Sequence, residues 1–532
     1  MNKTKLEPQD SNEENLEEEQ EEKSSSSNED ASVDESVIFP GLMLKYKYVL
    51  LRKIGAGSNA SVWLVWDASL KVVNAMKVQS SKCYEDGCRE VAIIRQVNKF
   101  AKEHPTKNTY SVLMSDFFTY VEDEDTNFVC SVYPLYAGAV QMLLNEGKYK
   151  YGLPIPTVKQ IALQLLRGLA VLHDDLHIIH TDVKPENILF RGATPDHLHT
   201  IELFTNSKFQ PRYEALLTKY GLRNNSTLKY PDQFVDDIEI LALECVKEIQ
   251  MIDEAFINEE EFQPDEEGDE NEIVEDDDSD GEADDSEDSV IEDEMGGNIM
   301  NTRTQSVDDL VEFADCQEMY NLETITRVED GVEVKMYDYV TVKNNRSKTT
   351  DPKTIIDDAY VVKCLIDLTD FGNAYFFEKR TKNEVQARYY RAPEVILNMN
   401  YGYSCDIWST GCVLFELLTG FPLFDPYKEP LHQDIHHLYQ LEKLLGPMPT
   451  QMKKKSPRSK FLFDKKRNYH IKNIESFQQI PLKTYLMTLH LFSESDATEI
   501  SDFITATLTY APSERPTAKE LLQHPWLKGV EI

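Results

Sequence analysis

A glycine-rich segment early in the chain contains the first residues that could do chemistry. It lies between two runs of Val, Leu and Tyr that predict strands. Glycine lets a backbone come close to phosphate groups, so two strands joined in this way could form a lid over a nucleotide, although a glycine pair between strands is also common in an ordinary tight turn. The segment comprises Ile54, Gly55, Ala56, Gly57, Ser58, Asn59, Ala60, Ser61 and Val62, with Ala60 where the usual third glycine would stand.

Lys77 and Glu90 favour the nucleotide interpretation. Lys77 lies in the next predicted strand among apolar residues, where an ammonium group is costly unless it meets anionic partners. Glu90 begins a stretch in which Val91, Ile94 and Val97 recur at helical spacing. Its carboxylate could pair with Lys77 and hold the ammonium towards a nucleotide. The plainer alternative is a glutamate on a solvated helix face.

Two polar segments follow, each after a strongly apolar element. After an amphipathic helix predicted over 156–173 the chain reads His180-Thr181-Asp182-Val183-Lys184-Pro185-Glu186-Asn187, and after the apolar run 361–368 it reads Asp370-Phe371-Gly372. With the lid, Lys77, Glu90 and the later Ala392-Pro393-Glu394, these segments resemble the ordered motifs of the eukaryotic protein kinases. Asp406 and Arg515 resemble two structural residues of the same family, a buried aspartate beneath the catalytic loop and a partner of Glu394.

This resemblance implies a fold, cofactors and roles. The fold would be α+β and bilobal, with a small β-rich lobe at about 46–133 and a larger helical lobe at about 137–190 and 360–528. Asp370 and Asn187 would hold Mg²⁺ ions that bridge the phosphates of ATP. Asp182 would accept the proton of the attacking hydroxyl, and Lys184 would neutralise charge on the transferring phosphate. A catalytically silent scaffold is the main rival, but every residue that the chemistry requires is present.

The segment 128–136 resembles the last strand of the small lobe and the hinge that binds adenine. Tyr133 would lie at the back of the pocket, and the backbone amide of Tyr136 would meet the base. Pro134 has no amide to donate, but its carbonyl could still accept from an adenine amino group.

Several details resemble one branch, the SR-protein kinases, which phosphorylate serines in Arg-Ser repeats. They are Thr181 before the catalytic aspartate, a long insertion before Asp370, Gly372-Asn373-Ala374, and Gln386-Ala387-Arg388-Tyr389-Tyr390-Arg391. The resemblance implies a serine/threonine kinase for Arg/Ser-rich protein substrates. Since Thr181 replaces an arginine that usually binds a phosphorylated activation segment, we expect activity without that phosphorylation.

The chain departs from this branch at the helix that reads arginines. Asp434 fits the acidic pattern of that helix, but His436 and Lys443 stand where acids are expected, and Phe371 replaces a usual leucine. A dual-specificity or cyclin-dependent-type kinase is the alternative, since Arg388 to Glu394 and Leu444-Leu445-Gly446-Pro447 resemble that wider group too. His432, His436 and His437 are predicted to lie on an exposed helix face. Lys453 to Lys455, with Arg458, favour a solvated loop over a localisation signal.

Charge divides the 532-residue chain into unlike parts. Residues 1–36 hold 13 acidic residues and 3 Lys, and residues 253–296 hold 24 acidic residues with no Lys or Arg, so these two segments carry most of the net charge of −39. Their composition predicts disorder, giving a disordered tail at 1–45 and an insert at 191–359 that is largely disordered at its centre. Both segments would repel phosphate, so no direct nucleic-acid partner is expected.

The remaining sequence features predict an intracellular protein, in the cytoplasm and/or the nucleus, that contacts no membrane and acts as a monomer. No apolar run approaches the roughly 20 residues that cross a bilayer, and the N-terminus is acidic. The eight cysteines are scattered with no CxxC pair, which favours reduced thiols. His173, His177 and His180 are spaced like zinc ligands, but the kinase resemblance already accounts for them.

Overall fold

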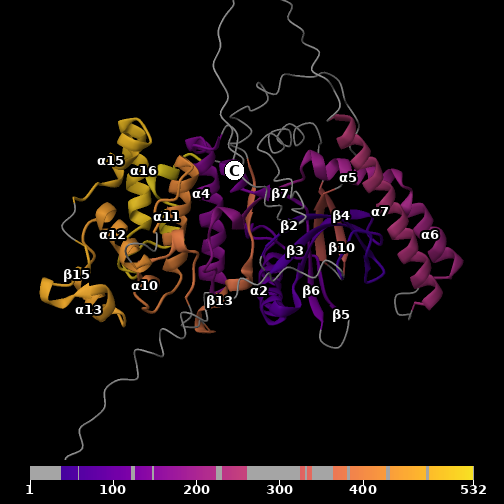
Figure 1. Cartoon of the computed structure of the whole chain (residues 1–532), viewed down its shortest axis with the longest axis horizontal. Helices are drawn as coiled ribbons and strands as arrows, with labels where there is room; N and C mark the ends of the chain where they lie inside the picture. The colour runs from indigo at the N-terminus through magenta and orange to yellow at the C-terminus, as the bar shows by residue number, and fades with distance from the viewer. Residues whose placement is uncertain are drawn as a thin grey trace, which may run out of the picture.

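The structure is a computed structural model of the whole chain. It describes residues 37–57, 59–121, 126–145, 149–222, 230–260, 324–329, 332–337, 364–379, 384–426, 432–474 and 478–530, with the side chains of 253–260 and 324–337 left aside. Two lobes are visible in Figure 1, a strand-rich one built from the N-terminal part of the chain and a helical one at the other end of the molecule. The predicted α+β arrangement in two lobes is confirmed.

The small lobe is built on an antiparallel sheet in the order β1-β2-β3-β4-β6-β5. Its strands are β1 (Met43–Leu44), β2 (Tyr48–Ala56), β3 (Ala60–Asp67), β4 (Val72–Gln79), β5 (Asp116–Val121) and β6 (Asn127–Tyr133). Apolar residues alternate along the central strands and fill both faces. One face contributes to the main core together with helix α2 (Tyr84–Glu103), whose Val91, Ile94 and Val97 are buried.

The chain just before β2 covers the other face of this sheet. Ile38 and Leu44 are buried there against Tyr48, Trp63 and Met76. The predicted disordered tail to residue 45 is therefore wrong for residues 37–45, because apolar side chains so close to the sheet can be buried by it. The rest of the predicted tail, 1–36, lies outside the described residues.

The large lobe is helical around a single long helix. Helix α4 (Ile155–Ala170) continues into the turn Val171–Asp175, and together they are apolar and long enough to cross a membrane by composition alone. In the fold, however, most of this segment is buried among other elements of the lobe. The other helices of the lobe are α10 (Pro393–Ile396), α11 (Ser404–Thr419), α12 (Gln433–Leu445), α13 (Thr450–Lys455), α14 (Ser459–Leu462), α15 (Leu482–Leu489), α16 (Glu494–Thr507) and α17 (Ala518–Leu521). Of these, α11 and α17 pack against α4.

A three-stranded sheet at the junction of the lobes positions the site residues. It pairs β7 (Tyr136–Ala139) with β9 (Ile188–Arg191) and β9 with β12 (Ile366–Leu368). The hinge therefore leads into β7, the catalytic loop ends at β9, and β12 leads to Asp370. A second pair, β8 (Ile178–Ile179) with β13 (Tyr375–Phe376), joins the start of the catalytic loop to the segment after Gly372.

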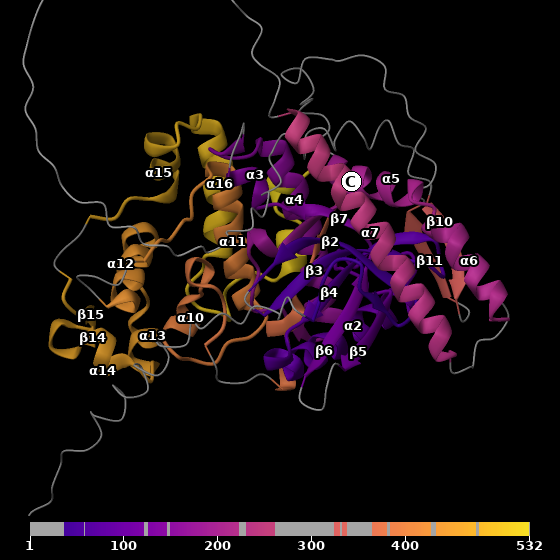
Figure 2. The same cartoon turned by 45° about the vertical axis from the view of Figure 1, so that its right-hand side comes forward.

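The first part of the predicted insert is not disordered. It forms α5 (Pro195–Asn206), α6 (Phe209–Lys219) and α7 (Asp232–Glu260), which lie side by side against the small lobe in Figures 1 and 2. Phe204, Phe209 and Phe234 are fully buried among these helices and the sheet. The sequence pattern concealed this packing because acidic residues separate the apolar positions of α7.

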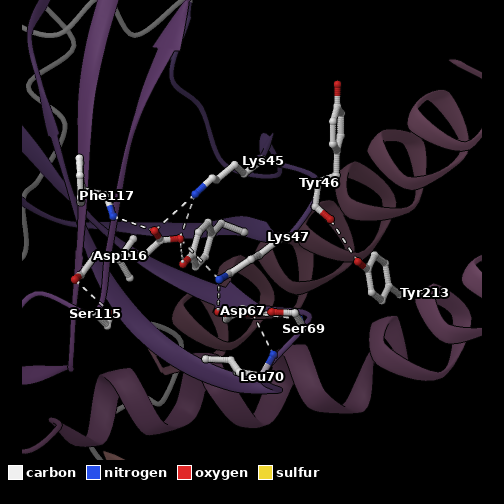
Figure 3. A network of polar contacts seen from close by, with 12 residues as sticks. Lys45, Tyr46, Lys47, Asp67, Ser69, Leu70, Ser115, Asp116, Phe117 and Tyr213 are labelled. Atoms are coloured by element: carbon white, nitrogen blue, oxygen red, sulfur yellow. Dashed lines mark hydrogen bonds and ion pairs between the residues drawn. The ribbon is translucent and has the colours of Figure 1, made fainter. Parts of the chain in front are cut away.

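Polar contacts tie these helices to the sheet. Trp66 Nε1 donates to Gln210 at 2.9 Å, and the Tyr213 hydroxyl donates to the Tyr46 carbonyl at 3.1 Å. The second contact lies at the turn before β2, where Lys45 and Lys47 reach Asp116 at 3.2 and 3.5 Å (Figure 3). The insert thus reinforces the outer edge of the small lobe. Beyond Glu260, only the hairpin β10 (Thr324–Glu329) with β11 (Val332–Tyr337) is described before residue 364, so most of the acidic run 253–296 lies outside the described residues.

Candidate active site

Lys77, Glu90 and Asp370 meet where the two lobes adjoin, a region that we call the cleft. The Lys77 ammonium lies 2.8 Å from Glu90 Oε2 and 3.0 Å from Asp370 Oδ1. Burial alone would lower the pKa of Lys77, but attraction to Glu90 and then Asp370 outweighs it and raises that pKa. In the same way, burial would raise the pKa of Asp370, but Lys77 lowers it. The lysine therefore stays charged and the aspartate ionised, as a site for anionic phosphates and cations requires.

The loop before β9 brings together the second set of predicted residues. Lys184 Nζ lies 2.8 Å from Asp182 Oδ2. Asn187 donates its side-chain amide to the Asp182 carbonyl at 2.9 Å and to Asp182 Oδ2 at 3.2 Å. Burial would lower the pKa of Lys184, but its hydrogen bond to Asp182 raises it. An aspartate with a lysine and an amide on one side is held in one orientation, which suits a base that must meet an incoming hydroxyl.

Asp406 holds this loop from beneath. It is fully buried at the start of α11, and its carboxylate accepts hydrogen bonds from the backbone amides of His180 and Thr181 and from His173 Nε2, each at 2.8 Å. Thr181 has a positive φ of 66°, a strained conformation for a β-branched residue. The buried carboxylate offsets that cost by fixing both amides. His173 and His180 thus serve the loop, and no group of three or more His, Cys, Asp or Glu side chains in the described ranges is arranged to hold a metal ion.

Two contacts pin the segment after Asp370 without a phosphate group. Thr181 Oγ1 donates to the Asn373 carbonyl at 2.6 Å. Arg89, on α2 beside Glu90, donates to the Gly372 carbonyl at 2.8 Å and lies over the ring of Tyr375. Sequence analysis missed Arg89, because nothing in its local pattern distinguishes it from other cations on the helix.

The segments predicted as lid and hinge form a hairpin between β2 and β3 and the connection from β6 to β7. Gly55 pairs with Val62 and Ala56 with Ser61, and the Gly57 amide donates to the Ala60 carbonyl at 2.9 Å, so the segment is a hairpin. Ser58 at its tip lies outside the described residues. Tyr133 is buried at the end of β6, and Pro134 precedes Tyr136 at the start of β7.

The residues present fit ATP and Mg²⁺. Asp370 and Asn187 supply a carboxylate and an amide oxygen, the hard donors that Mg²⁺ takes alongside phosphate oxygens. Because the amide nitrogen of Asn187 is committed to Asp182, its oxygen is the atom that can meet a cation. Lys77 adds a fixed positive charge next to Asp370.

Arg515 and Glu394 form a further buried link between distant segments. Two hydrogen bonds of 2.8 and 3.0 Å join them, and both side chains are fully buried. This geometry satisfies the guanidinium and the carboxylate together, as a buried pair must. With Asp406, the pair completes the ordered series of motifs.

A model of the protein kinase domain matches residues 48–203 and 355–527, on either side of the acidic run. The chain belongs to the protein kinase family. A serine/threonine-protein kinase of Acanthamoeba polyphaga mimivirus is 46% identical over 93% of this chain and 90% of its own length. Protein kinase dsk1 of Schizosaccharomyces pombe is 29% identical over 91% of this chain and 81% of its own, and SRSF protein kinase 3 of Homo sapiens is 27% identical over 90% and 86%.

These comparisons confirm the predicted enzyme class and branch. The chain is a serine/threonine kinase, and its relatives include the SR-protein kinases at 25–29% identity. This low sequence identity agrees with the residues that depart from that branch, His436, Lys443 and Phe371. The kinase domain is split by the insert, as predicted from the change in composition.

The helix expected to read arginines differs from its prediction. Asp434 at the start of α12 is buried, and Arg388 and Arg458 each bind one of its carboxylate oxygens. The prediction of an exposed histidine face is wrong for His436 and His437, which are buried in the lobe, and holds only for His432. Lys453 is also buried, 2.5 Å from Glu442, so the predicted solvated loop is wrong there.

Proposed function

We propose that this kinase transfers the γ-phosphate of ATP, with Mg²⁺, to serine or threonine hydroxyls of protein substrates. The single observation that supports it best is that Lys77, Asp182 and Asp370 lie in one site: Lys77 pairs with Asp370, and Lys184 pairs with Asp182 and is also attracted by Asp370. Bound Mg²⁺ would supply charge neutralisation at the phosphates.

Each residue of the cleft then has a part in the transfer. Lys77 orients the inner phosphates, and Asp370 and Asn187 hold the metal ions. Asp182 accepts the proton of the substrate hydroxyl, and Lys184, 2.8 Å from it, is placed to neutralise charge on the phosphoryl group as it moves. The hairpin 54–62 covers the phosphates, and the carbonyl of Pro134 with the amide of Tyr136 binds adenine.

Arg/Ser-rich proteins are the substrates that we propose. The name of the human relative, SRSF protein kinase 3, and the Gln386 to Arg391 segment support this choice. The acidic run 253–296 supports it as well, since 24 negative charges would attract arginine-rich proteins at long range. Because Asp434 is paired inside the lobe and is not offered to an arginine of a substrate, a dual-specificity or cyclin-dependent-type kinase of the wider group stays the second candidate. We further propose a monomer, in the cytoplasm and/or the nucleus, without a direct nucleic-acid partner.

A substrate panel tests the proposal. Purified full-length protein is incubated with labelled ATP and Mg²⁺ and with one of three peptides, an Arg-Ser repeat, an acidic peptide or a Ser-Pro peptide. We expect transfer to the Arg-Ser repeat, lost when EDTA removes the metal. Preference for the Ser-Pro peptide would favour the second candidate, and transfer to no substrate with no ATP binding would refute the kinase proposal.

A further inference from the structure

A polar cluster behind the hinge joins four separate elements. Arg191, at the end of β9, donates to Asp367 of β12 through two hydrogen bonds of 2.7 and 2.8 Å. The Tyr136 hydroxyl donates to the same carboxylate at 2.9 Å. Arg191 also donates to Asn108 Oδ1 at 3.1 Å, in the loop between α2 and β5. The kinase motifs account for none of Arg191, Asp367 and Asn108.

This cluster is costly to build, which argues against an incidental surface contact. Asp367 is 3% exposed, and burial raises its pKa even with Arg191 beside it. Its charge therefore depends on both donors. Backbone bonds fix the surrounding strands: the Arg191 amide donates to the Leu365 carbonyl, and β12 is held on its other side by Gln164 of α4, which bonds the backbone of Cys364 and Ile366.

The cluster links the two protein segments that would bind the opposite ends of the nucleotide. Tyr136 is the hinge residue whose amide would meet adenine, and Asp367 lies three residues before Asp370, which would hold the metal ion. The Tyr136 hydroxyl donates a hydrogen bond to the Asp367 carboxylate. A shift of the hinge relative to β12 would break this bond and leave a buried carboxylate short of a donor.

We propose that Asp367 and Arg191 are positioning residues that hold the side chain of Tyr136, and thereby the adenine-binding hinge, at a set distance from the strand that carries Asp370. This inference rests on the proposed nucleotide binding at the same hinge. It predicts that the cluster determines affinity for the base end of ATP, while the phosphoryl-transfer step depends on other residues.

The variant Tyr136→Phe tests this role because it removes only the hydroxyl and keeps the hinge amide. We expect the KM for ATP and the Kd for ADP to rise about fivefold to tenfold, which matches the net contribution of one ordinary hydrogen bond. The kcat and the KM for the peptide should change less than twofold. Tyr213→Phe is the matched control: it also loses one tyrosine hydrogen bond, to the Tyr46 carbonyl, but far from the cleft, and should leave both nucleotide constants unchanged.

The variant Asp367→Leu, which removes the acceptor, and the double variant then separate positioning from general stability. If the hydroxyl acts through Asp367, adding Tyr136→Phe to Asp367→Leu should raise the Kd for ADP by less than twofold more. Binding of inorganic triphosphate, measured by calorimetry, should stay unchanged in all variants. An unchanged Kd for ADP in Tyr136→Phe, or equal losses for ADP and triphosphate, would overturn the inference. Failure of the wild-type protein to bind ADP would instead refute the proposed function.

Discussion

The catalytic cleft and the start of α12 both present an aspartate among cations, but with opposite consequences. Asp370 keeps 37% of its side chain exposed while one of its oxygens accepts from Lys77. Asp434 keeps 6%, and both of its oxygens are taken by arginines of the same lobe. In the cleft the cations hold a carboxylate ready for a ligand, whereas at α12 they neutralise it. A charge in the sequence therefore predicts a binding surface only if the fold leaves it available.

The surroundings of α12 extend this contrast. The exposed cations between α12 and α15 are Lys454, Lys455, Lys460, Lys465, Lys466 and Arg467. Lys443 on α12 itself lies over the ring of Tyr439. This surface would repel an arginine-rich peptide, so attraction to such substrates has to come from elsewhere, and the acidic run 253–296 is the segment with the required charge.

The largest expected effect comes from removing the cleft carboxylates. We expect Asp182→Asn and Asp370→Asn each to lower kcat about a thousandfold or more, since one removes the base and the other a metal ligand. Steady-state kinetics measure this, and thermal unfolding serves as the control for folding. A variant at Asp182 with near-normal kcat would show that the catalytic assignment is wrong.

Replacing the aspartate at the start of α12 by asparagine should lower stability and leave catalysis intact. Asp434→Asn leaves Arg388 and Arg458 with a neutral partner, so we expect the free energy of unfolding to fall by about 1–3 kcal/mol. The KM for an Arg-Ser peptide should stay within about twofold. Denaturant unfolding and peptide kinetics provide the two readouts. A large rise in KM with unchanged stability would mean that Asp434 contacts substrate after all.

Reversing the charge of the half-buried Lys443 on α12 should create attraction for an arginine-rich peptide. Lys443→Glu changes the charge at this position by two units, next to the exposed cations named above. We expect the KM for an Arg-Ser peptide to fall a few-fold at low salt and to approach the wild-type value at high salt. Lys443→Gln separates loss of the lysine from gain of the acid. Identical KM values for both variants at low ionic strength would contradict this electrostatic account.

The acidic run should affect long substrates only. Because α7 extends to Glu260, a Gly/Ser replacement of residues 261–296 keeps the described helix intact. We expect kcat on a short peptide to be unchanged and binding of a long Arg-Ser protein to weaken a few-fold, chiefly at low salt. Equal binding by both proteins under those conditions would leave the run as a spacer.

The smallest effect is expected from dephosphorylation. Thr181 and Arg89 already bind the carbonyls of Asn373 and Gly372, so the segment after Asp370 needs no phosphate to hold it. Activity after phosphatase treatment should stay within about twofold. A large loss that a second kinase restores would show that these contacts are insufficient.

The order of the motifs can be read from the sequence, and that order is enough to predict the kinase fold, the enzyme class and the candidate residues of the cleft. Those residues are set by short local patterns, such as Asp182 to Asn187 and Asp370 to Gly372, whose chemistry leaves few alternatives. It also located the insert, because composition changes along the chain.

Tertiary structure alone decided which charges remain available and which segments pack. Asp434 meets Arg388 and Arg458 only in the folded lobe, and Asp367 meets Tyr136 across 231 positions of sequence. Residues 37–45 and helices α5 to α7 carry weak local signals, yet the small-lobe sheet gives their few apolar side chains a surface to cover. Such pairings depend on distances that no local pattern encodes, because burial and ion pairing are properties of segments brought together from far apart in the chain.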